Sequence, residues 1–183
     1  VSQVFRKPLR WHVELQMESS RASVGHIDIP FKPSSVARKM AAVAWTLGRD
    51  TGANIVYANG ASEAEDIAMV LATQASSIDH RPPDKELEEV IELVQAVIHK
   101  KDRLASGLKG RVGYHYGNMP LIVRRSIESL FANGKIDYLV CTSTLVEGVN
   151  LPCRNLFVRG PRRGKGNPMS EADFWNLAGR AGR

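Results

Sequence analysis

Four short apolar runs recur along this chain of 183 residues, and most of the stretches between them have helical periodicity. The runs are continuous rather than alternating, which is typical of strands in a parallel sheet that is covered on both faces. They are NIVYA (54–58), VGYHY (112–116), DYLVC (137–141) and NLFV (155–158). Because strand and helix alternate, the sequence predicts an α/β fold with three layers, α/β/α, around a mainly parallel sheet.

Capping residues predict where the intervening helices begin and end. Serine and aspartate side chains accept hydrogen bonds from the first free N–H groups of a helix, proline fits its first turn, and glycine ends it. Ser62 and Glu65 also have the spacing of a capping box. The predicted helices run from Ser35 to Gly48, from Ser62 through Leu71, from Asp84 through Val97, and from Pro120 to Gly134.

Residues 1–30 have weak periodicity, and we interpret them as a segment that enters from a preceding domain, with a strand expected at Trp11–Leu15. Residues 31–183 are expected to form one domain that stops within a motif, as part of a longer chain. The opening stretch has no apolar signal region, and no run is long enough to cross a membrane. Two cysteines make neither a disulfide framework nor a zinc site. A cytoplasmic protein with no membrane partner and no metal ligands of its own is expected.

The net charge of +6 is unevenly placed. Residues 154–183 carry seven basic and two acidic side chains, whereas residues 51–153 carry ten basic and thirteen acidic ones. A basic end on a nearly neutral body favours a polyanionic partner such as nucleic acid. A charged surface that serves only solubility is the alternative.

Small and polar residues directly follow three of the predicted strands: Asn59-Gly60, Gly117-Asn118 and Thr142-Ser143-Thr144. Ligands of parallel sheets bind beyond the carboxyl ends of the strands. Hydroxyls and backbone amides there can contact the phosphates of a nucleic-acid strand without reading its bases, so such contacts do not distinguish DNA from RNA. The three hydroxyls can also cap a short helix that begins at Leu145, and the two interpretations are compatible.

Two longer stretches make a similarity specific. GYHYGNMPLIVRRSIESLFANGKIDYLVCTSTLVEGVNLP (113–152) and DFWNLAGRAGR (173–183) resemble the second, C-terminal RecA-like domain of superfamily two helicases. The similarity is to the DExH branch of superkiller type, which includes related bacterial helicases. CTSTLVEGVNLP matches motif V, NLAGRAGR matches motif VI, and NIVYANG resembles motif IV.

The resemblance implies a role for each matched residue. Residues that would line the track of a single strand are Asn59, Gly60, Gly117, Arg124, Thr142, Ser143 and Thr144. Residues that would approach the nucleotide are Gly148, Asn150, Arg180 and Arg183. Arg180 and Arg183 are the candidate catalytic residues, because the motif VI arginines of the family reach the phosphates of ATP. If this segment is helical, the two side chains share one face.

The implied activity is that of an ATP-dependent helicase, an ATP hydrolase that acts on single-stranded or partly duplex nucleic acid. The chain contains neither GxxxxGK[ST] nor DExH, so the first RecA-like domain of the same protein is expected to hold ATP and Mg²⁺. The fragment alone is therefore expected to be inactive. Two other functions fit the residues: a RecA-like module that binds nucleic acid or protein without catalysis, and a duplex translocase that does not unwind.

Arg162, Arg163 and Lys165 lie in a basic loop between motifs V and VI. Relatives have a β-hairpin there that helps to separate strands, so the resemblance implies that this loop contacts nucleic acid at the duplex junction. Three glycines and two prolines within residues 160–168 are also typical of a flexible, solvated connection.

Four ring side chains are expected to serve packing. His115 follows a buried strand with no carboxylate partner evident, so a packing or backbone contact is favoured over a general base. Trp45 is expected in the core. Trp11 and Trp175 are expected to pack against the sheet, with stacking on bases as the alternative.

Overall fold

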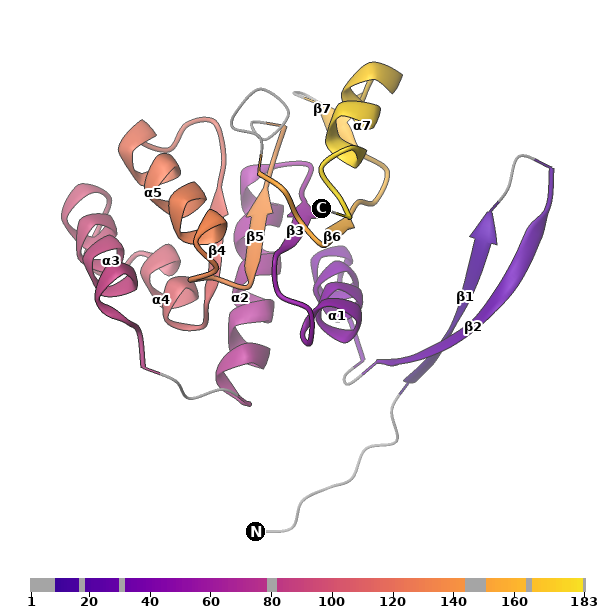
Figure 1. Cartoon of the computed structure of the whole chain (residues 1–183), viewed down its shortest axis with the longest axis horizontal. Coiled ribbons are helices and arrows are strands. Elements are labelled where there is room, and N and C mark those ends of the chain that lie inside the picture. The colour runs from indigo at the N-terminus through magenta and orange to yellow at the C-terminus, as the bar shows by residue number, and fades with distance from the viewer. Residues whose placement is uncertain are drawn as a thin grey trace, which may run out of the picture.

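The computed structural model describes residues 9–16, 19–29, 32–78, 82–143, 151–163 and 166–182. An antiparallel hairpin of β1 (Leu9–Gln16) and β2 (Arg21–Ile29) is followed by alternating helices and strands (Figure 1). The helices are α1 (Val36–Gly48), α2 (Ala61–Ser76), α3 (Lys85–Val97), α4 (Arg103–Lys109), α5 (Leu121–Ala132) and α7 (Glu171–Ala178). The central strands are β3 (Asn54–Tyr57), β4 (Val112–His115), β5 (Tyr138–Cys141) and β6 (Asn155–Phe157). Two short strands, β7 (Arg162–Arg163) and β8 (Asn167–Pro168), form a second hairpin.

The central sheet has the strand order β4-β5-β3-β6, and every pair in it is parallel. All four strands predicted from the apolar runs are confirmed. The residues of β3, β4 and β5 are buried throughout, which is why these strands read as continuous apolar runs rather than as alternating ones. Beyond the sheet, Ala181 forms a parallel bridge with Cys153, so the chain near its carboxyl end lies beside the start of β6.

Helices cover both faces of the sheet, which makes the predicted three-layer α/β/α architecture. Helix α2 contacts α1 and α4 and packs on β4 and β5, so these three helices form one layer. Helix α5 packs on the same two strands and contacts α3, which in turn contacts α4 at the β4 side of the sheet (Figure 1). A single core joins the layers, with Ile55, Val140 and Leu139 fully buried in the sheet.

Most predicted helix ends are confirmed, and one predicted cap is wrong. Ser35 and Asp84 accept hydrogen bonds from backbone N–H groups at the starts of α1 and α3. Gly134, with a φ of 67°, follows the end of α5 in a conformation that favours glycine. Ser62 does not cap α2, because the helix begins at Ala61 with Gly60 at its N-cap. The carboxylate at its start is Glu63, which accepts from the Asn59 N–H at 2.8 Å.

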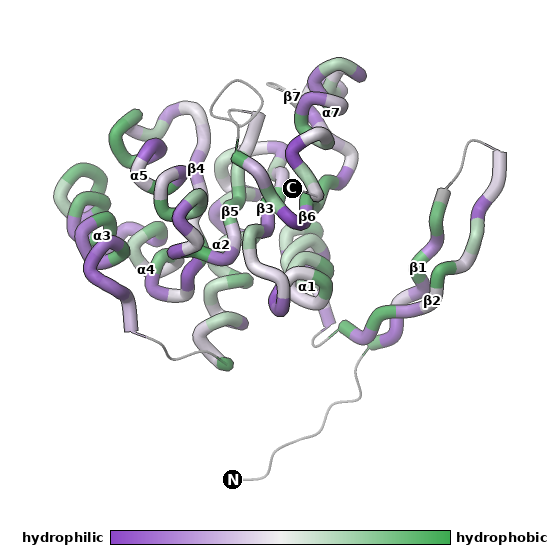
Figure 2. Tube along the Cα trace, viewed as in Figure 1, coloured by the Kyte–Doolittle hydropathy of each residue, from purple (hydrophilic) through white to green (hydrophobic). Residues whose placement is uncertain are grey.

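The sequence interpretation missed two helices, α4 and α7, and the strand β2. Helix α4 has seven residues and is capped by Asp102. The strand expected at Trp11–Leu15 lies within β1, but its partner β2 was not predicted. Hydropathy alternates along both strands (Figure 2), and the hairpin extends away from the sheet (Figure 1) while Ile29 at its base is fully buried. No helix in the described part of the chain is long and apolar enough to cross a membrane.

The tryptophan predictions have mixed outcomes. Trp45 is buried and stacks on Tyr138 with 6.1 Å between ring centroids, as expected for a core residue. Trp175 does not pack against the sheet: it is 64% exposed on α7, beside Phe174. Trp11 lies half-buried within the β1–β2 hairpin, which is separate from the central sheet.

Close contact between β4 and its neighbours predicts that Gly113→Ala destabilises the protein. An added Cβ would lie 2.8 Å from Ile127 Cγ2 and 2.8 Å from Ile136 Cδ1. Overpacking of this kind costs about 1–3 kcal/mol. We expect a loss of this size in the free energy of unfolding, measured by urea denaturation. Ile136→Val removes one of the two contacting atoms, so the double variant should lose less than the sum of the single losses. Additive losses would contradict this account.

Candidate functional site

A hollow of about 330 Å³ lies at the carboxyl ends of β3, β4 and β5. Parallel strands end at the same edge of a sheet, so the segments that follow them meet there. The structure thereby brings together six residues predicted from the sequence: Asn59, Gly60, Gly117, Thr142, Ser143 and Arg162. We call this hollow the strand-end groove. Its remaining lining residues are Ala58, Ala61, Tyr116 and Asn118.

The polar surface of the strand-end groove suits an extended anionic ligand. Thr142 and Ser143 are partly exposed just after β5, and Gly60 has no neighbouring atom that an added Cβ would meet within 4 Å. Small residues of this kind let a ligand approach the backbone closely. Gly60 also precedes the first turn of α2, where free N–H groups favour negative charge. Hydroxyls, backbone amides and Arg162 together can contact phosphate oxygens.

Other predicted residues stand apart from this groove or outside the described residues. Arg124 is not among the residues that line the groove. It lies on α5, and its buried Nε has no hydrogen-bond partner among the described residues. For Arg163 only the backbone, paired with Asn167, is described. Thr144, Gly148, Asn150, Lys165 and Arg183 lie outside the described residues.

Arg180 lies beyond the end of α7, and it is only 5% exposed. The helix that would place Arg180 and Arg183 on one face is not formed, because α7 ends at Ala178 and Gly182 has a φ of 77°. The backbone of this segment is held against Cys153 instead: Cys153 N–H donates to the Arg180 carbonyl at 2.9 Å, and Gly182 N–H donates to the Cys153 carbonyl at 2.9 Å.

The Arg180 charge acts on the interior near the end of β5. Burial raises the pKa of Cys141, and Arg180 partly opposes that rise. Burial likewise raises the pKa of Cys153 to about 11, again with Arg180 opposing it. The positive charge of Arg180 therefore favours the thiolate forms of both cysteines, against the larger effect of burial.

The buried His115 is paired with the half-buried Glu128, which the sequence did not reveal. His115 ends β4 and is fully buried, and its Nε2 lies 3.5 Å from Oε1 of Glu128 on α5. Burial lowers the pKa of His115 to about 4, and the Arg124 charge adds to the effect. Burial also raises the pKa of Glu128, against the nearby arginines. A neutral histidine with so low a pKa is a poor general base near pH 7, which agrees with the packing role expected for it.

The basic loop between residues 159 and 168 contains a β-hairpin among its described residues. Arg162 pairs with Pro168 and Arg163 with Asn167, and the Met169 N–H donates to the Pro161 carbonyl at 3.0 Å. Two side chains from the end of β3 attach its first strand to the sheet. Tyr57 and Asn59 both form hydrogen bonds with the backbone of Arg162. Tyr57 was not singled out from the sequence, since a buried tyrosine in an apolar strand carries no signal of such a bond.

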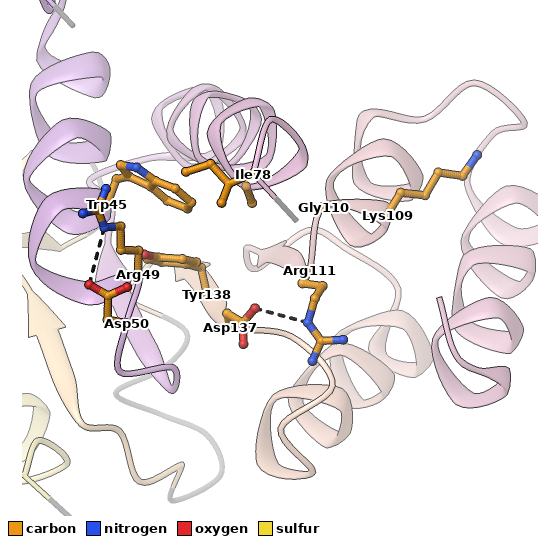
Figure 3. Close-up of a pocket in the computed structure, with 10 residues that line it drawn as sticks. Trp45, Arg49, Asp50, Ile78, Lys109, Gly110, Arg111, Asp137 and Tyr138 are labelled. Atoms are coloured by element: carbon orange, nitrogen blue, oxygen red, sulfur yellow. Dashed lines mark hydrogen bonds and ion pairs between the residues drawn. The ribbon is translucent and has the colours of Figure 1, made fainter. Parts of the chain in front are cut away.

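A second hollow, of about 210 Å³, lies at the opposite edge of the sheet (Figure 3). Trp45 and Tyr138 form part of its wall, and its charges are largely matched within the protein. Arg111 Nε lies 3.2 Å from Asp137, and Arg49 Nε lies 3.5 Å from Asp50 (Figure 3). No predicted site residue lines this hollow. This second hollow therefore does not carry the chemistry suggested by the sequence.

A parallel sheet covered by helices on both faces, with a polar groove beyond the carboxyl ends of its strands, is a RecA-like α/β/α fold. Residues 87–183 match the family described as "Helicase conserved C-terminal domain". That match covers more than half of the chain, and the chain belongs to this family.

Curated relatives are similar over most of this chain but are much longer. The Hachiman protein HamB of Bacillus cereus is 31% identical over 137 residues, which make up 73% of this chain and 12% of HamB. The ATP-dependent DNA helicase Hel308 of Methanocella arvoryzae is 30% identical over 72% of this chain and 19% of that helicase. The ATP-dependent DNA helicase MER3 homolog of Oryza sativa is 29% identical over 70% of this chain and 11% of that protein.

The buried His115 predicts that acid destabilises the protein. The unfolded chain protonates this histidine below its ordinary pKa of 6.5, whereas the folded protein does so only below about 4. The free energy of unfolding should therefore fall as the pH drops through this window, by about 2 kcal/mol between pH 7.5 and pH 5. The raised pKa of Glu128 has the opposite sign and offsets part of the effect.

Urea denaturation of three chains at both pH values checks this prediction. His115→Gln should flatten the pH dependence of the free energy of unfolding, because its amide does not titrate. Glu128→Gln should steepen it, because the opposing carboxyl is gone while His115 remains. The same pH dependence in all three chains would show that this pair does not control acid stability.

Proposed function

We propose that the chain is the second RecA-like domain of an ATP-dependent DNA helicase of the DExH, superkiller type. The observation that carries the proposal is the strand-end groove, where six residues assigned to nucleic acid from the sequence line one hollow of about 330 Å³. Relatives named as ATP-dependent DNA helicases support both the use of ATP and the choice of DNA. The chain spans about a tenth to a fifth of the length of these relatives, so the activity belongs to a longer protein.

In this proposal a single strand crosses the strand-end groove and is held through its phosphates. Thr142 and Ser143 donate from the end of β5, and Gly60 and Gly117 line the same hollow. Thr144 follows them in sequence. Contacts of this kind grip the strand without reading its bases. Partly duplex DNA meets the hairpin formed by β7 and β8, with Arg162, Arg163 and Lys165 near the junction.

ATP lies between this domain and the first RecA-like domain of the same protein, which supplies the Walker lysine and the carboxylates that hold Mg²⁺. Arg180 and Arg183 stabilise charge on the transferred phosphoryl group, and Gly148 and Asn150 approach the nucleotide. Residues 31–183 form the domain, and residues 1–30 connect it to the preceding one. The chain alone has half of an ATP site and does not turn over ATP. Closure and opening of the two domains move the grip along the strand.

Thr142→Val tests the strand-end groove. The valine keeps the shape of threonine but removes a hydroxyl that would donate to a phosphate. One such hydrogen bond is worth about 0.5–1.5 kcal/mol, so the dissociation constant for single-stranded DNA should rise about two- to tenfold. Fluorescence anisotropy with a labelled oligonucleotide measures it across a salt titration.

Thr73→Val is the matched control for this measurement. Thr73 Oγ donates to the Met69 carbonyl at 2.8 Å on α2, away from the strand-end groove. This variant should bind single-stranded DNA like the unchanged protein. If Thr142→Val also binds DNA unchanged at every salt concentration, the groove is not the binding site.

Arg183→Ala tests the nucleotide side in the longer protein. An arginine that stabilises phosphoryl transfer contributes about 10³–10⁵ in rate, so ATP turnover should fall by a factor in that range. Arg183→Lys should fail nearly as badly, since a point charge does not replace the planar guanidinium. Arg180→Ala should also lower the melting temperature, because Arg180 is only 5% exposed in the folded protein.

Three activities of the longer protein separate the proposal from its alternatives: ATP turnover, strand separation and DNA binding. Turnover close to that of the unchanged protein in a folded Arg183→Ala variant would contradict the catalytic role. A longer protein that turns over ATP with DNA but separates no strands would be a translocase. One that binds DNA but never hydrolyses ATP would be a non-catalytic module.

A further inference from the structure

We call the hairpin formed by β7 and β8 the basic hairpin. Its first strand, β7, lies beyond the end of the ladder between β3 and β6. The last paired residues of that ladder are Val56 and Phe157. The chain continues from β6 through residues 158–161 into β7, still beside the residues that follow β3. Backbone pairing is replaced there by hydrogen bonds from side chains at the end of β3.

Two of these bonds hold one residue, Arg162, by both of its backbone groups. Asn59 Oδ1 accepts from the Arg162 N–H at 2.7 Å, and the Tyr57 hydroxyl donates to the Arg162 carbonyl at 2.6 Å. Tyr57 and Asn59 are two residues apart, the spacing at which side chains of an extended segment point the same way. Together they provide an acceptor and a donor, as a neighbouring strand would.

The other side of the same strand is held by the hairpin itself. The carbonyl of Pro161 accepts from the Met169 N–H at 3.0 Å, across the hairpin from Tyr57 and Asn59. Successive backbone groups of an extended chain point in opposite directions, so Pro161 bonds toward β8 while Arg162 bonds toward β3. The first strand of the hairpin is therefore bonded along both edges, although it is only two residues long.

Glu63 fixes the position of Asn59 within this arrangement. Its Oε2 accepts from the Asn59 N–H at 2.8 Å, and its Oε1 lies 3.8 Å from Nη2 of Arg159. Asn59 Nδ2 also approaches the Arg159 carbonyl at 3.5 Å. Tyr57 is 2% exposed, so its ring is held by packing. The bonds to Arg162 thus come from side chains that have little freedom to move.

We propose that Tyr57 and Asn59 are positioning residues that hold the basic hairpin at a set angle to the strand-end groove. This inference rests on the proposed helicase function. A hairpin that separates strands is pushed by the duplex, and two bonds to one peptide segment prevent it from pivoting. Asn59 then holds the hairpin through its side chain and also lines the groove for the single strand, together with its neighbour Gly60.

Tyr57→Phe in the longer protein tests this proposal, because it removes only the hydroxyl that donates to Arg162. Hydrogen exchange at the amides of Arg162 and Met169, followed by mass spectrometry, should become at least tenfold faster. Separation of a forked DNA duplex should slow at least fivefold, while ATP turnover stimulated by single-stranded DNA should change less than twofold. Equal losses of separation and turnover, or unchanged exchange, would overturn the positioning role.

Tyr138→Phe is the matched control. Tyr138 donates to the Ala44 carbonyl at 3.4 Å, so the substitution also removes a buried tyrosine hydroxyl, but at the opposite edge of the sheet. It should leave hydrogen exchange at Arg162 and strand separation unchanged. Effects as large as those of Tyr57→Phe would mean that both variants act through general stability, which counts against the proposal.

Two substitutions of Asn59 separate the anchoring bond from side-chain size. Asn59→Asp keeps an oxygen that accepts from the Arg162 N–H, whereas Asn59→Leu has none. Exchange at Arg162 should stay within threefold of the unchanged protein in the first and rise at least tenfold in the second. Equal rates in the two variants would contradict the anchor.

Failure of this inference is distinguishable from failure of the proposed function. Hydrogen exchange reports on the anchor without DNA or ATP. If the unchanged longer protein does not separate strands, the helicase proposal fails and the exchange data still decide whether Tyr57 and Asn59 hold the hairpin. If strands are separated but exchange is the same in all variants, the anchor fails and the helicase proposal stands.

Discussion

Parallel pairing of β3 and β4 with β5 is the constraint on which the site depends. Tyr57 and His115 both lie opposite Cys141, the last residue of β5, so three strands end at the same level. Among the described residues the ladder of the central sheet ends at this level, and the small and polar residues that follow the three strands line one hollow. The strand-end groove is therefore a consequence of the register of the sheet. A shift in the register of β5 against β3 and β4 would separate Thr142 from Gly60 and Gly117.

The sequence predicted the fold well where one physical cause dominates locally. Burial on both faces produces the four apolar runs, and the capping bonds of Ser35 and Asp84 are formed within three residues of the cap. The prediction failed where neighbours compete or the signal is short. Glu63 and Glu65 are both available at the start of α2, and spacing alone does not tell which carboxylate reaches the backbone. The seven residues of α4 are too few to show a helical period.

The candidate site divides in the same way. Residues directly after a strand could be placed in the groove, because the parallel sheet brings them together whatever their side chains do. Contacts made across the fold could not be read from the sequence. Tyr57 bonds to a carbonyl 105 residues away, and Glu128 reaches His115 from a helix on the sheet. The burial of Arg180 was missed for a related reason: it depends on the pairing of its segment with Cys153.

Both cysteines of the chain are fully buried, and burial raises the pKa of each thiol. Alkylating reagents attack the thiolate, which is scarce at neutral pH when the pKa is raised and is out of reach when the sulfur is enclosed. Thiol-directed dyes should therefore leave both native cysteines of the folded chain unlabelled, and neither cysteine has to be replaced before labelling. A cysteine introduced at the exposed position of Asn167 would react selectively with a maleimide fluorophore. Energy transfer between this fluorophore and a second dye, on the DNA, would report movement of the hairpin in single molecules.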